Sequence, residues 1–252
     1  MSAKSVVIDR RRFDGAIFDL DGVLTDTARV HASAWKATFD IFLQSWAQRH
    51  GLTFQPFDIE ADYFAYVDGR PRYDGIRTFL AARGINLPEG SEHDPEAADT
   101  VRALGERKTK LFRQALQNGI APTAGAAALL KKLRDLGLRT AMISSSKNAS
   151  AILNAAKIEH HFDVCVDGVD ADILALPGKP DPSLFLETTR RLGIRPSRAI
   201  VLEDSLAGVE AGKRGGFGCV VGIDHGKRRV TLFQRGADVV VKSLQEVHVE
   251  EN

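Results

Sequence analysis

Short apolar runs alternate with helix-like segments along the second half of the chain. Segments such as "NASAILNAAK", "PSLFLETTRRLG" and "SLAGVEAGKRGG" have the spacing of amphipathic helices, and Pro182 suits a first helical turn. Before them, a leucine stripe and Gly137 predict a helix and its end (Leu129, Leu130, Leu133, Leu136). The intervening runs predict short buried strands: "RTAMIS", "FDVCV", "AIVLED", "FGCVVGI" and "ADVVV". This alternation predicts βαβ units and a parallel sheet.

The first half has a different pattern. Gly15–Leu20 reads as a buried strand, and a long helix is predicted from Thr27 to about Arg49. Its apolar positions near helical spacing are Val30, Ala34, Ala37, Ile41 and Trp46. Residues 51–119 are polar and mostly helical, but Gly84–Thr100 is rich in Pro, Gly and acids and predicts a surface loop or insertion. We therefore expect a doubly wound, Rossmann-like parallel α/β core (1–27 and 120–252) with a smaller helical cap (28–119) inserted after the first strand.

Composition narrows the class of protein. The 252 residues carry a formal charge of +1, which argues against nucleic acid as the main partner. The run "DRRR" at Asp9–Arg12 is too short for a binding arm and predicts a solvated segment. No apolar run approaches the roughly 18 residues of a membrane span, and the N-terminus lacks a secretory signal pattern. We expect a cytoplasmic protein without a membrane partner, in which Cys165 and Cys219 are buried free thiols.

Candidate chemistry follows the apolar runs. Asp19 and Asp21 end the first run, Ser144 follows "TAMI", and Lys179 stands in "GKPDP". Glu203 and Asp204 end "AIVLED". Ligand sites of open parallel sheets lie beyond the carboxyl ends of the strands, so we expect these groups to converge.

The converging groups suit phosphoryl transfer. Carboxylates without His or Cys favour Mg²⁺, and a hydroxyl with a lysine suits phosphoryl oxygens. One aspartate can become an aspartyl phosphate, and the second, two residues on, can lie on the same side of the chain and protonate the leaving oxygen.

Simpler interpretations of each motif exist. An EF-hand loop from Asp19 would need Gly at position six and Glu at twelve, where Leu24 and Val30 stand, so that interpretation fails. The two aspartates could cap a helix, Ser144 could form a turn, and Lys179 could be a surface lysine. Glu203 and Asp204 could simply favour the positive end of the next helix. The catalytic interpretation depends on the combination.

The motifs "FDLDGVLTDT", "ISSSKN", "GKPDP" and "LEDS" resemble those of the haloacid dehalogenase superfamily, in the same order and over almost the whole chain. The resemblance implies that Asp19 is the nucleophile and Asp21 the general acid and base. Ser144 and Lys179 would bind the phosphoryl group. Asp19, the Asp21 backbone carbonyl, Asp204 and Glu203 would bind Mg²⁺. The second aspartate argues against dehalogenase activity.

Within the superfamily, further segments resemble the β-phosphoglucomutase family. "TDTARVHASAWK" would place Thr27 at a hinge, with His31 and Trp35 facing the substrate. "DGRPRYDGI", which contains Gly69, resembles the cap loop that grips a distal phosphate through an arginine, here Arg72. The remaining substrate-binding residues implied by the resemblance are Lys108, Ser146, Lys147 and Asn148. Without it, His31 and Trp35 would be helix-surface or packing residues, and Arg72 and Lys108 solvated cap charges.

The chain departs from the family pattern at three places. Ser183 occupies the usual acidic position after "KPxP", and an acid, Asp181, comes earlier. The cap loop reads "PRYDG", in which the arginine and one aspartate remain. The insertion at Gly84–Thr100 is longer than in the smallest relatives and could alter cap closure or form an oligomer surface.

The resemblance implies a Mg²⁺-dependent isomerase that converts β-D-glucose 1-phosphate into glucose 6-phosphate, with β-glucose 1,6-bisphosphate as activator and intermediate. The alternative is a phosphatase of a small sugar phosphate or of phosphoglycolate. A non-catalytic binding protein is a third hypothesis, disfavoured because every core catalytic residue is present. We expect a monomer, with a dimer as the alternative.

Overall fold

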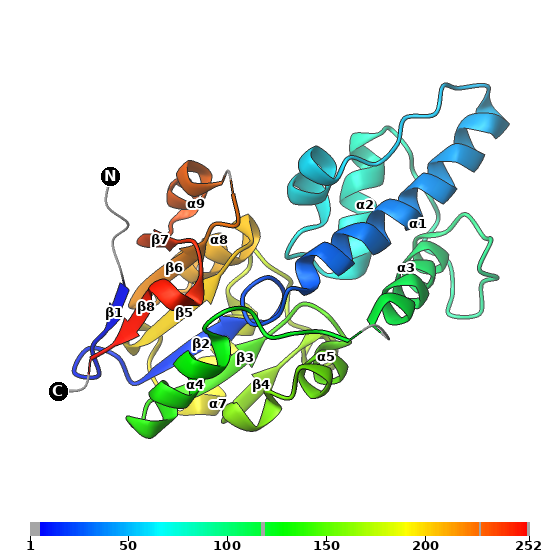
Figure 1. The fold of residues 1–252 in the computed structure, drawn as a ribbon. Helices are drawn as coiled ribbons and strands as arrows, with labels where there is room; N and C mark the ends of the chain where they lie inside the picture. Colours follow the sequence, from blue (N-terminus) through cyan, green and yellow to red (C-terminus); the bar gives the residue numbers. More distant parts are fainter. Residues whose placement is uncertain (1–5, 117–118, 227, 251–252) are drawn as a thin grey trace. The chain divides into compact units, whose positions relative to one another are not determined.

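The computed structural model describes residues 6–116, 119–226 and 228–250 (Figure 1). The chain divides into two compact units, residues 1–26 with 120–252 and residues 27–119. Thr27, counted above with the core, is the first residue of the second unit. Each unit is described by itself.

The first unit is built on a six-stranded sheet in the order β4-β3-β2-β5-β6-β7. Every neighbouring pair is parallel. Strand order runs outward in both directions from β2, which confirms the doubly wound core. The strands are β2 (Gly15–Asp19), β3 (Arg139–Ile143), β4 (Val164–Val166), β5 (Ala199–Glu203), β6 (Cys219–Ile223) and β7 (Val239–Val241).

Helices bury both faces of this sheet, as parallel sheets require. Side chains from α7, α8 and α9 share one apolar cluster with inward residues of the strands, including Phe185, Val209 and Leu232. Right-handed crossovers place α4 and α5 on the opposite face. The helices are α4 (Ala126–Asp135), α5 (Ala149–Ala156), α6 (Gly168–Ile173), α7 (Ser183–Leu192), α8 (Leu206–Arg214) and α9 (Arg229–Arg235).

Several short elements were not expected from the sequence. β1 (Val6–Ile8) pairs in parallel with β8 (Val247–Val249), and α6 and α9 occupy segments without a clear period. The described part of the chain also contains the single 3₁₀ turns η2 (Glu159–His161), η3 (Pro196–Arg198) and η4 (Leu244–Glu246). Elements of three to seven residues are too short to show periodicity.

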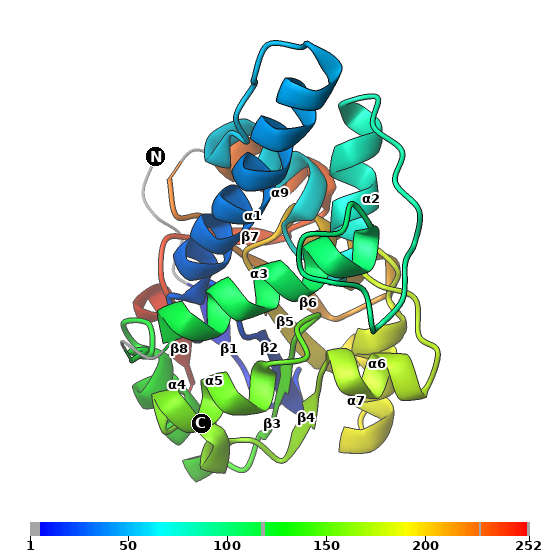
Figure 2. The same cartoon turned by 90° about the vertical axis from the view of Figure 1, so that its right-hand side faces the viewer.

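The second unit is helical, as expected. It contains α1 (Thr27–His50), the π-helical segment η1 (Ile59–Val67), α2 (Arg72–Ala82) and α3 (Val101–Leu116). α1 and α3 pack side by side (Figure 2). Its core is aromatic, with Phe39, Phe57 and Phe79 in mutual ring contact. Ile41, placed above on the apolar stripe of α1, is 53% exposed, so that assignment was wrong.

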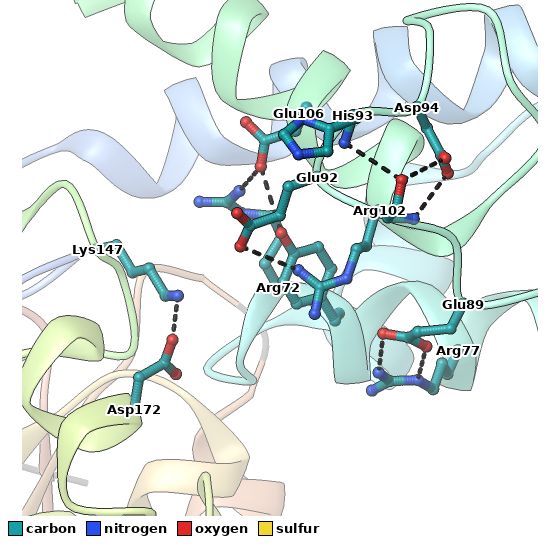
Figure 3. A network of polar contacts seen from close by, with 12 residues as sticks. Arg72, Arg77, Glu89, Glu92, His93, Asp94, Arg102, Glu106, Lys147 and Asp172 are labelled. Carbon is teal, nitrogen blue, oxygen red and sulfur yellow. Dashed lines mark hydrogen bonds and ion pairs between the residues drawn. The ribbon is translucent and has the colours of Figure 1, made fainter.

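The segment Gly84–Thr100 is a loop, as predicted, and ion pairs hold it to the helices of its own unit (Figure 3). Arg77 of α2 binds Glu89 through two nitrogens, at 3.2 and 2.7 Å. The Asp94 carboxylate accepts from the Ser91 amide and hydroxyl and from the Thr100 hydroxyl, which closes the loop on itself.

Candidate active site

Three strand ends at one edge of the sheet carry most of the predicted core residues. Asp19 is the last residue of β2, Ser144 follows β3, and Glu203 ends β5 with Asp204 next to it. Because these strands are neighbours and parallel, their carboxyl ends lie together. The sequence prediction that these segments converge is therefore confirmed.

Lys179 reaches the centre of this cluster from the loop before α7. Its ammonium lies 2.5 Å from Asp19 Oδ1 and also donates to Glu203 Oε1. Burial alone would lower the pKa of Lys179, but the two carboxylates outweigh burial and raise it above its usual value. Lys179 is therefore a cation held beside the proposed nucleophile.

Asp19 is buried and surrounded by charge. Burial raises its pKa well above the ordinary value; Lys179 opposes this effect, and Glu203 and Asp21 add to it. The Asp21 amide donates to Asp19 Oδ2 at 3.1 Å, and the Ser144 hydroxyl lies 3.4 Å from Asp21 Oδ2. The two aspartates and the serine thus form one contiguous polar group.

The first turn of α8 orients Glu203. Ser205 donates to Glu203 Oε2 from its amide at 2.7 Å and from its hydroxyl at 2.9 Å. The same hydroxyl accepts from the Gly208 amide as an N-cap. A Cβ on Gly208 would lie 1.8 Å from Glu203 Oε1, so this position has no room for a side chain.

Gly22 permits the loop after Asp21 to approach Asp204. Its φ is +84°, and a Cβ there would lie 2.1 Å from Asp204 Oδ2. The glycine of "DLDG" is required by both the backbone conformation and the close approach.

Three carboxylates of the cluster have the chemistry of a cation site. Asp19, Glu203 and Asp204 each offer an oxygen, and these oxygens lie within 4.8 Å of one another. All three residues are buried, and Lys179 supplies a single positive charge among them. A hard divalent cation such as Mg²⁺ would fit this oxygen donor set.

The loop after Ser144 is organised by its own hydroxyl groups. The Ser146 amide donates to the Ser144 hydroxyl at 3.0 Å, and the Asn148 amide donates to the Ser146 hydroxyl at 3.2 Å. Lys147 forms an exposed ion pair with Asp172 of α6 (Figure 3). Gly168 packs against this loop, and a Cβ there would lie 2.7 Å from the Ser145 carbonyl oxygen.

In the helical unit, His31 and Lys108 form a buried pair. Lys108 Nζ lies 2.6 Å from His31 Nδ1, and the imidazole stacks on Phe112 with ring centroids 4.0 Å apart. The same ammonium lies 5.2 Å from the centre of the Trp35 ring. Three residues that the family resemblance singled out are thus neighbours, and Thr27 is buried at the start of α1.

Arg72 is already paired within its unit. It is the first residue of α2, and its guanidinium lies 2.8 Å from Glu106 Oε1 of α3 (Figure 3). Gly69, in the turn before α2, has φ +71°, which suits glycine. A phosphate bound by Arg72 would share it with Glu106 or displace Glu106.

Sequence reasoning missed His225 at this edge of the sheet. It lies in the loop after β6, and its Nε2 is 2.7 Å from the Gly22 carbonyl oxygen and 3.6 Å from Asp204 Oδ2. Its position in the sequence could have identified it, because Asp224 and His225 directly follow the apolar run "FGCVVGI", which predicts a strand.

The chain belongs to the haloacid dehalogenase-like hydrolase family, whose model matches residues 13–216. This match agrees with the parallel core, the inserted helical unit and the buried Asp19 cluster. Fold and relatives together support an enzyme of the phosphomutase or phosphatase class.

Individual relatives narrow the class further. A β-phosphoglucomutase of Mycobacterium bovis is 44% identical over 235 residues, which make up 92% of this chain and 90% of the relative. A phosphorylated carbohydrates phosphatase of Thermotoga maritima is 26% identical over 242 residues, 94% of this chain and 97% of that protein. The crystal structure of a β-phosphoglucomutase from Clostridium difficile has a TM-score of 0.73 and 25% identity, and the match covers 93% of this chain and 92% of that one.

Proposed function

We propose that this chain is a β-phosphoglucomutase that converts β-D-glucose 1-phosphate into glucose 6-phosphate. The observation that carries the phosphotransfer chemistry is the buried contact of Lys179 with Asp19 and Glu203. The 44% identity with the Mycobacterium bovis enzyme favours a mutase. Because the substrate carries its phosphate on O1 and the product carries it on O6, the reaction requires two phosphoryl transfers.

In the first transfer, phosphorylated Asp19 donates its phosphoryl group. The 6-hydroxyl oxygen of β-glucose 1-phosphate attacks phosphorus, the bond from phosphorus to the Asp19 oxygen breaks, and the Asp21 carboxylate takes the hydroxyl proton. The products are β-glucose 1,6-bisphosphate, free Asp19 carboxylate and protonated Asp21. The proton on Asp21 is then available for the second transfer.

In the second transfer, the bisphosphate presents its 1-phosphate to Asp19. An Asp19 oxygen attacks phosphorus, the bond from phosphorus to the O1 atom of the sugar breaks, and Asp21 returns its proton to O1. Glucose 6-phosphate leaves and phosphorylated Asp19 is regenerated. Asp21 acts alternately as base and acid, so proton and phosphoryl group are both conserved over the cycle.

The surrounding residues stabilise the charge of the group in transfer. Lys179 and Ser144 bind its oxygens with an ammonium and a hydroxyl. Asp19, the Asp21 backbone carbonyl, Glu203 and Asp204 would hold Mg²⁺. The bound cation would offset the negative charge shared by carboxylate and phosphoryl oxygens.

A mutase must also hold the phosphate that is not reacting. We assign this role to Arg72 of the helical unit, whereas Ser146, Lys147 and Asn148 contact phosphate oxygens beside the core site. Lys108, His31 and Trp35 bind the sugar side of the substrate, with Gly69 in the loop that precedes Arg72. If Lys108 is charged, it donates to His31 Nδ1, and the imidazole proton then lies on Nε2, where it can donate.

The alternative is a phosphatase of a small sugar phosphate or phosphoglycolate that uses the same core. The likeness to the Thermotoga maritima phosphatase supports it. In that case water takes the place of the 6-hydroxyl group, and inorganic phosphate is the product.

Replacement of the nucleophile tests the shared chemistry. Asp19→Asn should abolish turnover of both β-glucose 1-phosphate and a simple phosphate ester, and intact-protein mass spectrometry should find no phosphorylated protein after exposure to the bisphosphate. Asp26→Asn is the control, because Asp26 is an exposed carboxylate in the same loop. Residual Mg²⁺-dependent turnover by Asp19→Asn would disprove the nucleophile assignment.

A further inference from the structure

His225 brings a further loop to the cluster of Asp19, Glu203 and Asp204. It follows β6, the neighbour of β5 in the sheet, so it emerges at the same edge as Glu203 and Asp204. Its side chain is 46% exposed, yet Nε2 is directed at the loop after Asp21 and lies 2.7 Å from the Gly22 carbonyl oxygen. A carbonyl oxygen accepts and does not donate, so Nε2 carries the proton in this hydrogen bond.

The loop that carries His225 is well anchored. The amide of Asp224 donates to the Val241 carbonyl of β7 at 2.8 Å, and Asp224 itself is buried. Its carboxylate Oδ1 accepts from the amides of Gly226 and Arg228, each at 3.0 Å. The imidazole is therefore presented from a turn held at both ends, which makes its contact with Gly22 more than a chance surface approach.

The hydrogen bond from His225 helps to fix the backbone at Gly22. The Gly22 amide donates to the Thr25 carbonyl at 2.8 Å, and the Gly22 carbonyl accepts from His225. The two peptide planes on either side of Gly22 are thus both fixed. The Asp21 carbonyl shares a peptide plane with the Gly22 amide, which Thr25 holds, whereas His225 holds the plane that follows. The two hydrogen bonds together therefore fix the backbone conformation of Gly22 between these planes.

We propose that His225 is a positioning residue: its Nε2–H holds the Gly22 carbonyl and so keeps Gly22 in the conformation that brings the loop after Asp21 against Asp204 at the cation site. Asp204 is involved because its Oδ2 lies so close to Gly22 that a Cβ there would be 2.1 Å away, and His225 Nε2 lies 3.6 Å from the same oxygen. This role rests on the proposed function, since it concerns the same cation site. His225 touches neither substrate nor the reacting atoms in this account.

The test is Mg²⁺ binding to the whole chain without substrate, measured by isothermal titration calorimetry. His225→Ala should bind Mg²⁺ roughly tenfold more weakly, as for other residues that orient metal ligands. His225→Gln should recover most of the affinity, because the glutamine Nε2 is the same number of bonds from Cα and donates a hydrogen bond. His248→Ala is the control, because His248 is an exposed histidine on β8.

A spectroscopic measurement keeps the test independent of folding defects in a variant. Nitrogen-15 spectra of the wild-type imidazole should show a proton of His225 on Nε2. An Nε2 that carries no proton would overturn the proposal. So would unchanged Mg²⁺ affinity in His225→Ala, or a His225→Gln variant as weak as His225→Ala.

The outcomes separate this proposal from the function. Wild-type protein that makes glucose 6-phosphate while His225→Ala binds Mg²⁺ normally would overturn only the role of His225. If His225→Ala loses Mg²⁺ affinity and His225→Gln recovers it, but the wild-type protein makes no glucose 6-phosphate, only the mutase assignment is overturned. Wild-type protein that binds no Mg²⁺ would overturn both the cation site and the positioning role.

Discussion

At the residue scale, the central feature is a lysine buried between carboxylates. Lys179 is 3% exposed, and Asp19 and Glu203 are also buried. Buried charges are tolerated only when paired, so removal of the ammonium leaves a strongly unfavourable group of acids. The residues that would perform the chemistry therefore also affect the stability of the fold.

Lys179→Met should lower the free energy of unfolding by about 3–5 kcal/mol, measured by urea denaturation in the presence of a chelator. Mg²⁺ should restore part of this loss. Lys147→Met is the matched control: its pair with Asp172 is exposed and should contribute less than about 1 kcal/mol. Similar losses in both variants would contradict the special position of Lys179.

A comparison of substitutions at Gly22 and Gly51 distinguishes the effect of a steric clash from that of backbone strain. Both have positive φ, at +84° and +65°, but a Cβ on Gly51 has no atom within 4 Å, whereas one on Gly22 would collide with Asp204. Gly22→Ala should lower kcat/KM by about 100-fold, as for displacements near 1 Å at a reacting centre. Gly51→Ala should only reduce stability. Steady-state kinetics with full activity in Gly22→Ala would refute the close approach.

The two cysteines give a pH prediction. Both are free and half-buried, not buried as expected, and burial raises the pKa of each thiol to about 11 from 9.0. Because the folded pKa is raised, their contribution to stability is complete below pH 9.0 and is lost as pH rises toward 11. Alkylation by iodoacetamide, followed by mass spectrometry, should be slow at pH 9 in the folded protein and fast in urea. Equal rates would show that the thiols are not protected.

The sequence identified several core residues because each directly follows a predicted strand, and the carboxyl ends of parallel strands lie at one edge of a sheet. These residues are Asp19, Asp21, Ser144, Glu203 and Asp204. The same rule would have found His225 had it been applied to the run before it. The departure at Ser183 is explained by a local contact: Asp181 accepts from the Ser183 amide at 2.9 Å and from its hydroxyl. Such contacts depend on backbone geometry that residue types alone do not specify.

At the element scale, α2 presents two arginines in different settings. Arg72 is mostly buried at the start of the helix beside Glu106, whereas Arg77 is exposed and binds Asp74 and Glu89. Long periodic elements such as α1 were predictable, but the buried face of α1 was not. Phe39, Phe42 and Leu43 are buried in place of Ile41 because the apolar positions of this helix cover more than one stripe.

Arg72→Ala should reduce the rate of glucose 6-phosphate formation by at least about tenfold while hydrolysis of a small phosphate ester changes little, because a small ester has no second phosphate. Arg77→Ala, on the same helix, should leave both rates near wild type. The measurement is the ratio of the two rates in each variant. Equal losses of both activities in Arg72→Ala would disprove its assignment to the second phosphate.

At the scale of the whole molecule, the chain consists of an α/β unit and an inserted helical unit. We propose that these units act as core and cap, which the pattern of alternating and non-alternating elements predicted. Among the helices described, none is long and apolar enough to cross a membrane. The location in the cell, the absence of a nucleic acid partner and the monomeric state stay predictions.

The same core chemistry serves a mutase or a phosphatase, so the acceptor of the phosphoryl group decides the function. The most direct measurement follows both products when β-glucose 1-phosphate is supplied with Mg²⁺ and a trace of β-glucose 1,6-bisphosphate. Our account predicts that glucose 6-phosphate forms much faster than inorganic phosphate. Inorganic phosphate as the main product, with little glucose 6-phosphate, would contradict it and assign the chain to the phosphatases.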